Sequence, residues 1–216
     1  MQIPAVFAVE MGEDAIGAVS VPEDRCLPET GDRVIPFADA AASVPRGETR
    51  EPAVVVDWDS IRARGFREAV LKGMRLRGRD IWFLAWVQDA DDLMDAFNTT
   101  AESVLFPYHA VASDDDLLDI LSMSDSAIPT VFVRNGKVVN RSIAPADLRE
   151  TVGRLDDLGF HRTCILDTDG SVTAYEWERI LDLHPLSIPF VTDASAVEGC
   201  CAGRLIAPLR LRPHLL

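Results

Sequence analysis

Short apolar runs alternate along the chain with longer segments in which apolar residues recur at helical spacing. Runs that carry few charges are typical of strands covered on both faces of a parallel sheet. We predict eight such strands, at Ile3–Val9, Ala53–Trp58, Ile81–Val87, Ser103–Phe106, Pro129–Arg134, Arg162–Asp167, Ser187–Thr192 and Gly203–Ala207.

Helices with readable ends lie between several of these strands. Ser113 is placed as an N-cap, and Gly159 follows the apolar stripe of the clearest helix, where a glycine favours termination. The predicted helices are Asp89–Phe97, Ser113–Leu121, Ala144–Leu158 and Ala174–Leu183.

The order strand, helix, strand, helix predicts an α/β protein built as a TIM-type (βα)8 barrel, with residues 1–216 as a single barrel domain. Two regions depart from a regular barrel. Val21–Pro52 contains five prolines and leaves room for one short helix, near Phe37–Ser43. Pro208–Leu216 is too short and too rich in Pro and Arg for a full last helix, so we predict a barrel truncated at its first and last helices.

The chain also repeats a pattern, which divides it into half-barrels of about 1–125 and 126–216. IPAVFAVEMGEDAIGAV and IPTVFVRNGKVVNRSI each give an Ile-Pro strand, a Gly turn and a second short apolar strand. VVVDWDSI and CILDTDGSV each end a strand in Asp-x-Asp. Duplicated half-barrels of this kind resemble the histidine-biosynthesis barrels, namely the ribotide isomerase and its sister cyclase subunit.

The resemblance implies two catalytic Asp residues at opposite strand ends, one to donate a proton and one to remove one. The positions that match them here are Phe7 and Phe132, although a shift of register by one or two residues would bring Glu10 to the first position. A phenyl ring transfers no proton, so both rings are expected to fill the barrel interior.

The resemblance also implies two phosphate sites on Gly-rich turns after the third and seventh strands. The corresponding turns, at 85–89 and 191–195, contain no Gly and carry Asp89 and Asp193, which would repel a phosphate. Ser195 could still hold an anion weakly. We therefore expect both phosphate sites to be lost.

Polar and aromatic side chains remain at the carboxyl-terminal ends of the strands, where barrels place their sites. We take Asp57, His109, Asp167 and Asp169 as candidate catalytic residues, and Glu10, Trp86, Gln88, Tyr108, Arg134, Asn135, Asp193 and Ser195 as candidate substrate-binding residues. For the four-residue catalytic set the plainer interpretation is structural: the Asp residues would serve as loop or helix caps, and His109 would pack at the rim.

The composition of the chain excludes some classes of binding partner. The net charge of −14 argues against nucleic acid, and no apolar run is long enough to span a membrane. We expect no signal peptide and hence a cytoplasmic protein. The four cysteines have no metal-binding spacing, and Asp167-Thr168-Asp169-Gly170 resembles a calcium loop only faintly, so no metal or cofactor is predicted.

Three functions stay open. The first is a divergent relative of the isomerase that performs isomerase- or lyase-like chemistry on another small molecule; the resemblance allows a role in one-carbon cofactor synthesis of the methanopterin or methanofuran type. The second is a non-catalytic binding or assembly barrel, in which truncated helices expose surface for a partner such as a second copy in a homodimer. The third is a retained ribotide isomerase.

Overall fold

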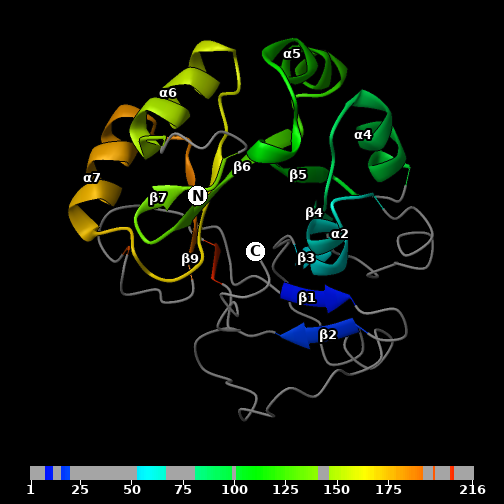
Figure 1. The fold of residues 1–216 in the computed structure, drawn as a ribbon, viewed down its shortest axis with the longest axis horizontal. Helices are drawn as coiled ribbons and strands as arrows, with labels where there is room; N and C mark the ends of the chain where they lie inside the picture. The colour runs from blue at the N-terminus through cyan, green and yellow to red at the C-terminus, as the bar shows by residue number, and fades with distance from the viewer. Residues whose placement is uncertain are drawn as a thin grey trace, which may run out of the picture.

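A computed structural model describes residues 8–11, 16–19, 53–66, 81–98, 101–140, 146–191, 197 and 205–206. Eight parallel strands follow one another across a single sheet in chain order (Figure 1). They are β1 (Ala8–Met11), β3 (Ala53–Val56), β4 (Ile81–Leu84), β5 (Ser103–Pro107), β6 (Ala127–Arg134), β8 (Cys164–Asp167), β9 (Ile188–Val191) and β10 (Leu205–Ile206). Each overlaps one predicted strand. Residues 3–7 of the predicted first strand lie outside the described part of the chain, and β1 continues two residues beyond the predicted end.

Two antiparallel hairpins extend this sheet. β2 (Ile16–Val19) pairs with β1, and β7 (Lys137–Val138) pairs with β6. Because β1 and β6 are the first and fifth of the eight parallel strands, each group of four begins with a strand that carries a hairpin. In the described parts of the two Ile-Pro segments, a parallel strand thus pairs with a second short antiparallel strand, as their pattern predicted.

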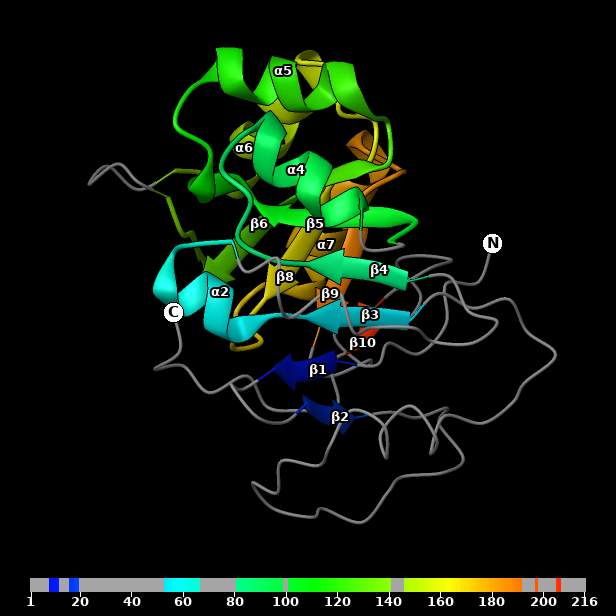
Figure 2. The ribbon, with the colours of Figure 1, turned by 90° about the vertical axis from the view of Figure 1, so that its right-hand side faces the viewer.

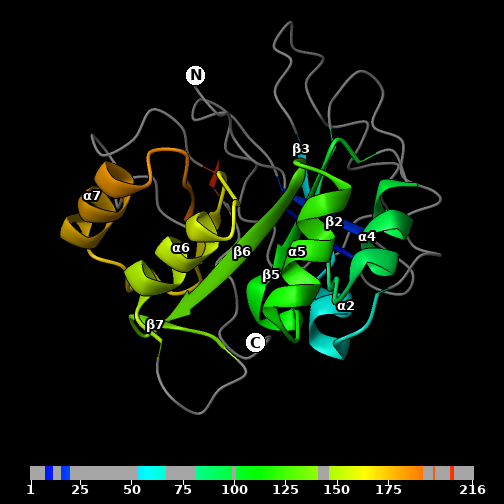
Figure 3. The same cartoon turned by 90° about the horizontal axis from the view of Figure 1, so that it is seen from above.

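Four helices cover one face of the sheet in an arc (Figures 1 and 3). α4 (Ala90–Phe97), α5 (Asp114–Met123), α6 (Leu148–Asp157) and α7 (Ala174–Leu183) confirm the four predicted helices, with α6 starting later than expected. Asp147, which lies inside the predicted range of that helix, instead caps its N-terminus. Ser113 caps α5, and Gly159 follows α6 with a positive φ of 107°, as predicted. Within the described residues a further helix, α2 (Trp58–Ala63), follows β3 and was not predicted.

Alternate residues of the strands face two apolar layers. One layer lies between the sheet and α4–α7, and includes Phe83, Phe106 and Trp177. The other lies on the opposite, inner face and includes Leu84, Phe132 and Phe190. The sheet thus forms a half-barrel with α4–α7 on its outer face (Figure 2), and the inner apolar layer lies on its other face. No pairing of β10 with β1 closes it among the residues described. The predicted irregular regions, at 21–52 and 208–216, lie outside those residues.

The β6–β7 turn requires backbone that favours glycine. Asn135 and Gly136 have φ values of 52° and 68°, which are typical of a two-residue hairpin turn. Replacing Gly136 with Ala is expected to lower the free energy of unfolding by about 1–2 kcal/mol, because a Cβ atom is strained in left-handed backbone. Urea denaturation would measure this loss.

Gly65 supplies the matched control, since it has no positive φ and a Cβ atom there would meet nothing within 4 Å. Gly65→Ala is expected to leave stability unchanged or raise it by up to about 1 kcal/mol. Equal losses in the two variants would contradict the proposed strain.

Candidate functional site

Most candidate side chains follow parallel strands and therefore share the carboxyl-terminal edge of the sheet. Asp57 follows β3, Trp86 and Gln88 follow β4, and Tyr108 and His109 begin a 3-10 helix, η1 (Tyr108–Ala110), after β5. Arg134 and Asp167 end β6 and β8, and Asn135 and Asp169 come just after them. Glu10 lies in β1, where its backbone pairs with Val56. Asp193 and Ser195 lie outside the described residues.

Asp57 is buried and caps α2. Its Oδ1 accepts a hydrogen bond from the Ser60 backbone N–H at 3.0 Å. The Ser60 hydroxyl donates to the Asp57 carbonyl at 2.9 Å and accepts from the Trp86 backbone N–H at 3.0 Å. This arrangement connects the ends of β3 and β4, and Asp57 serves to order it.

Asp167 orders the corresponding loop in the second half. Its two carboxylate oxygens accept hydrogen bonds from the backbone N–H groups of Ser171 at 3.0 Å and Val172 at 3.1 Å. Both Asp57 and Asp167 therefore have the capping role that we considered the plainer interpretation. Neither arrangement tests a catalytic role, which stays a prediction for both residues.

Asp169 and Ser171 hold the β6–β7 turn against the β8–α7 loop. The Asp169 carboxylate accepts from the Asn135 N–H, and the Ser171 hydroxyl oxygen accepts from the Gly136 N–H, both at 2.8 Å. A hydrogen bond thus joins Asn135 and Asp169, but it runs from the backbone N–H of Asn135 to the carboxylate of Asp169 and not between two side chains. The backbone N–H groups of Asn135 and Gly136 in this turn therefore already have hydrogen-bond acceptors within the chain.

The carboxyl groups of Asp167 and Asp169 have pKa values displaced in opposite directions. Burial raises the pKa of Asp167 despite the hydrogen bonds from Val172 and Ser171. Partial desolvation also acts to raise the pKa of Asp169, but hydrogen bonds from Ser171 and Asn135 outweigh it, so that this pKa is lowered. Of two neighbouring carboxyl groups whose pKa values differ in this way, the one with the higher pKa can act as a proton donor and the other as an acceptor.

An aromatic cluster, Trp86, His109 and Phe132, lies where β4, β5 and β6 meet the inner layer. The His109 ring makes edge contacts with Trp86 and Phe132, at centroid distances of 5.6 and 5.2 Å. Phe132 is fully buried, as expected for an interior ring, while His109 is half-buried. Trp86 is almost fully buried, and its Nε1 has no hydrogen-bond partner in the described structure. His109 is the titratable member of this cluster.

The start of α4, beside these loops, is closed to anions by carboxylates of the chain. Asp89 caps α4 by accepting from the Asp92 N–H at 3.0 Å, and Asp92 accepts from the Gln88 N–H at 3.0 Å. The amides that a phosphate would use after β4 are therefore bound by carboxylates of the chain itself. This agrees with the expected loss of a phosphate site at the 85–89 turn; residues 192–195 of the second turn lie outside the described residues.

The remaining candidates are directed elsewhere or make no described contact at the cluster. Tyr108 accepts a 3.4 Å hydrogen bond from Arg154, which also pairs with Asp114, so its hydroxyl is held beside α5 and α6. Gln88 is exposed, and Arg134 is half-buried.

Sequence reasoning missed the hydroxyl residues Ser60, Thr168 and Ser171. Thr168 donates from both its N–H and its hydroxyl to the Val133 carbonyl, at 3.1 and 2.8 Å. A signal was present, because a serine follows the Asp-x-Asp pattern in both halves.

Neither a metal centre nor a membrane span emerges within the portion described. No group of three or more His, Cys, Asp or Glu side chains there is arranged to hold a metal ion. No helix in the same residues is long and apolar enough to cross a bilayer.

Comparison with known proteins does not identify the chain. No protein-family model matches it, and a search of curated proteins finds no match. The resemblance to the histidine-biosynthesis barrels therefore stays a prediction from the sequence pattern.

Proposed function

We propose that this chain is a (βα)8 barrel related to the ribotide isomerase of histidine biosynthesis, that it has lost that reaction, and that it acts on a different, non-phosphorylated small molecule. The site is the carboxyl-terminal edge of the sheet, at the aromatic cluster. The observation that carries the proposal is Phe132, which is fully buried against His109 at the position where the resemblance requires a proton-transferring Asp.

The strand register supports this assignment. Phe132 pairs with Leu166, the residue before Asp167, and Glu10 pairs with Val56, the residue before Asp57. Glu10 and Phe132 therefore occupy corresponding levels in the two halves, so Glu10, rather than Phe7, is the counterpart of Phe132. One carboxyl group and one phenyl ring then replace the acid–base pair, and loss of one member of such a pair removes ~10²–10⁴-fold in rate.

The ligand class follows from what the edge offers. Carboxylates occupy the helix start at Asp89, which disfavours a phosphorylated substrate. Edge contacts with two buried aromatic rings hold a half-buried imidazole, which favours a planar heteroaromatic ligand that packs against His109 and accepts or donates one proton there. In this proposal His109 carries proton transfer, and Trp86 and Phe132 hold its ring in place.

The test uses the formimino ribotide substrate of the isomerase and inorganic phosphate. Purified protein is expected to give no turnover of the ribotide, no rescue of a histidine auxotroph and no saturable heat of phosphate binding at millimolar concentration. Turnover, rescue or phosphate binding would each overturn the proposal. Free aminoimidazole carboxamide, which lacks the ribose phosphate, is the positive probe, and it is expected to shift the His109 ring resonances in the wild type but not to bind His109→Ala.

A non-catalytic binding barrel is the second candidate, because Asp57 and Asp167 are both engaged as caps. Size-exclusion chromatography with light scattering separates the two. A stable homodimer that buries His109 from the probe would favour the binding barrel over the enzyme.

A further inference from the structure

The parallel ladder between β3 and β4 is interrupted where the two strands end. Its last direct bond runs from the Asp57 N–H to the Leu84 carbonyl, at 2.8 Å. In a regular parallel ladder the Asp57 carbonyl would next accept from the N–H two residues beyond Leu84, which is that of Trp86. The Asp57 carbonyl instead begins α2, where it accepts from the Ile61 N–H at 3.2 Å. The Trp86 N–H therefore needs another acceptor.

The hydroxyl of Ser60 is inserted at this place. It accepts from the Trp86 N–H at 3.0 Å and donates to the Asp57 carbonyl at 2.9 Å. One hydroxyl thus bridges the donor and the acceptor that a regular ladder would join directly, because it supplies both a donor and acceptor lone pairs. Ser60 is fully buried, so bulk water does not compete for these bonds.

A ladder in the second half also ends on a side chain. The Thr168 N–H donates to the Val133 carbonyl at 3.1 Å, and the N–H of Asn135, two residues beyond Val133, is bound by the Asp169 carboxylate at 2.8 Å. In both halves a side chain that follows a strand therefore accepts the N–H with which the neighbouring strand ends its ladder. The carboxylate only accepts, whereas the hydroxyl of Ser60 also donates.

The inserted hydroxyl sets the position of Trp86. It holds the Trp86 backbone farther from the Asp57 carbonyl than a direct hydrogen bond would. The Trp86 side chain belongs to the inner layer, and its ring contacts the His109 ring at a centroid distance of 5.6 Å. Ser60 is therefore linked, through one residue, to the imidazole to which we assign proton transfer.

We propose that Ser60 is a positioning residue of this site, whose hydroxyl fixes Trp86 against the His109 ring. The role of that imidazole rests on the proposed function, but the placement of the ring can be measured without any ligand. Without the hydroxyl, the Trp86 N–H either moves toward the Asp57 carbonyl or stays buried without an acceptor, which is costly. The first outcome displaces the indole directly, and the second favours a rearrangement that does so.

The test compares the His109 ring resonances of the wild type, Ser60→Ala and Ser60→Thr by NMR at pH 8, where free imidazole is uncharged. The chain has four histidines, and His109→Ala identifies the signals by their loss. Ring currents of Trp86 and Phe132 act on the imidazole protons, so a displaced indole changes these resonances. We expect a shift in Ser60→Ala and wild-type positions in Ser60→Thr, which keeps the hydroxyl.

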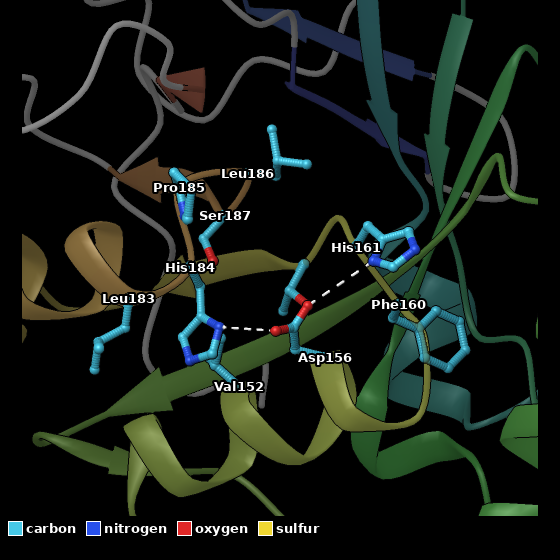
Figure 4. A pocket seen from close by; sticks show the side chains of 10 residues that line it. Val152, Asp156, Phe160, His161, Leu183, His184, Pro185, Leu186 and Ser187 are labelled. Carbon is cyan, nitrogen blue, oxygen red and sulfur yellow. Dashed lines mark ion pairs between the residues drawn. The ribbon is translucent and has the colours of Figure 1, made fainter.

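Thr151→Val is the matched control. It also removes a buried hydroxyl from the first turn of a helix, since Thr151 donates to the Asp147 carbonyl at 2.8 Å. Thr151 precedes Val152, which lines a pocket between α6 and the end of α7 (Figure 4), and that pocket shares no residue with the aromatic cluster. This variant should therefore leave the His109 resonances where they are in the wild type.

Binding of free aminoimidazole carboxamide is the second readout. Ser60→Ala is expected to raise the Kd of this probe about three- to tenfold, the effect of one lost hydrogen bond, whereas Ser60→Thr and Thr151→Val should bind as the wild type does. A wild type that does not bind the probe would contradict the proposed function, and the ring comparison would still decide the role of Ser60.

If Ser60→Ala does not fold, Ser60→Cys replaces it in the comparison, because a thiol fills a similar volume but is a weak donor and acceptor. Three results would each overturn the proposal. They are unchanged His109 resonances in the folded variant that lacks the hydroxyl, an equal displacement in Thr151→Val, and an equal displacement in Ser60→Thr.

Discussion

Replacing Phe132 with Ala is expected to lower the free energy of unfolding by about 3–5 kcal/mol. Phe132 is fully buried in the inner layer and contacts the His109 ring at 5.2 Å. Deleting its ring removes apolar burial and leaves a cavity among strands that cannot collapse far, since β5 and β8 hold β6 from both sides. Urea denaturation followed by circular dichroism would measure the loss.

Two variants bracket this effect. Phe132→Leu keeps most of the volume and is expected to cost about 1.5 kcal/mol or less. Tyr175→Ala removes an aromatic ring that is 63% exposed and contacts Arg179, so its cost should stay below about 1 kcal/mol. A loss for Phe132→Ala that is no larger than the loss for Tyr175→Ala would contradict the interior role of this ring and the proposed function that depends on it.

The strand and helix pattern was predictable because it depends on local spacing. The bounds of α7 follow from its apolar period, with Trp177, Ile180 and Leu181 buried on one face, and from the capping box that Thr173 and Glu176 form. α2 escaped prediction because it has six residues and follows directly on an apolar strand, which leaves too few turns for a helical period.

The geometry of the site was less predictable, because its contacts join residues that are far apart in the chain. Asn135 and Asp169 are 34 residues apart, and their hydrogen bond depends on the left-handed turn of the β6–β7 hairpin. The residues of the aromatic cluster likewise come from three separate segments, and only the pairing of β4, β5 and β6 in the sheet brings their rings into contact. Sequence placed all of these residues at one edge of the sheet, but it could not show which of their atoms meet.

Replacing Asp167 with Ala is expected to lower the free energy of unfolding by about 2–4 kcal/mol. The carboxylate is the acceptor for the N–H groups of Ser171 and Val172, and each buried donor left without a partner costs about 1–3 kcal/mol. Asp167→Asn keeps one acceptor oxygen and should lose about half as much. Thermal and urea unfolding would rank the two variants, and equal stability of Asp167→Ala and the wild type would contradict the role of this carboxylate in ordering the β8–α7 loop.

The neighbouring carboxyl groups should respond to pH in opposite senses. Burial raises the pKa of Asp167, so its contribution to stability is complete below about pH 4 and decreases as the pH rises through the folded-state pKa. Hydrogen bonds lower the pKa of Asp169, so its contribution is present above about pH 4 and is lost as the pH falls through the folded-state pKa. The stability difference between the wild type and Asp167→Asn should therefore shrink between about pH 3 and pH 7, whereas the difference for Asp169→Asn should grow. Urea unfolding at four pH values measures how each stability difference changes with pH. If both differences changed in the same direction, the pKa values of the two carboxyl groups would not be displaced in opposite directions.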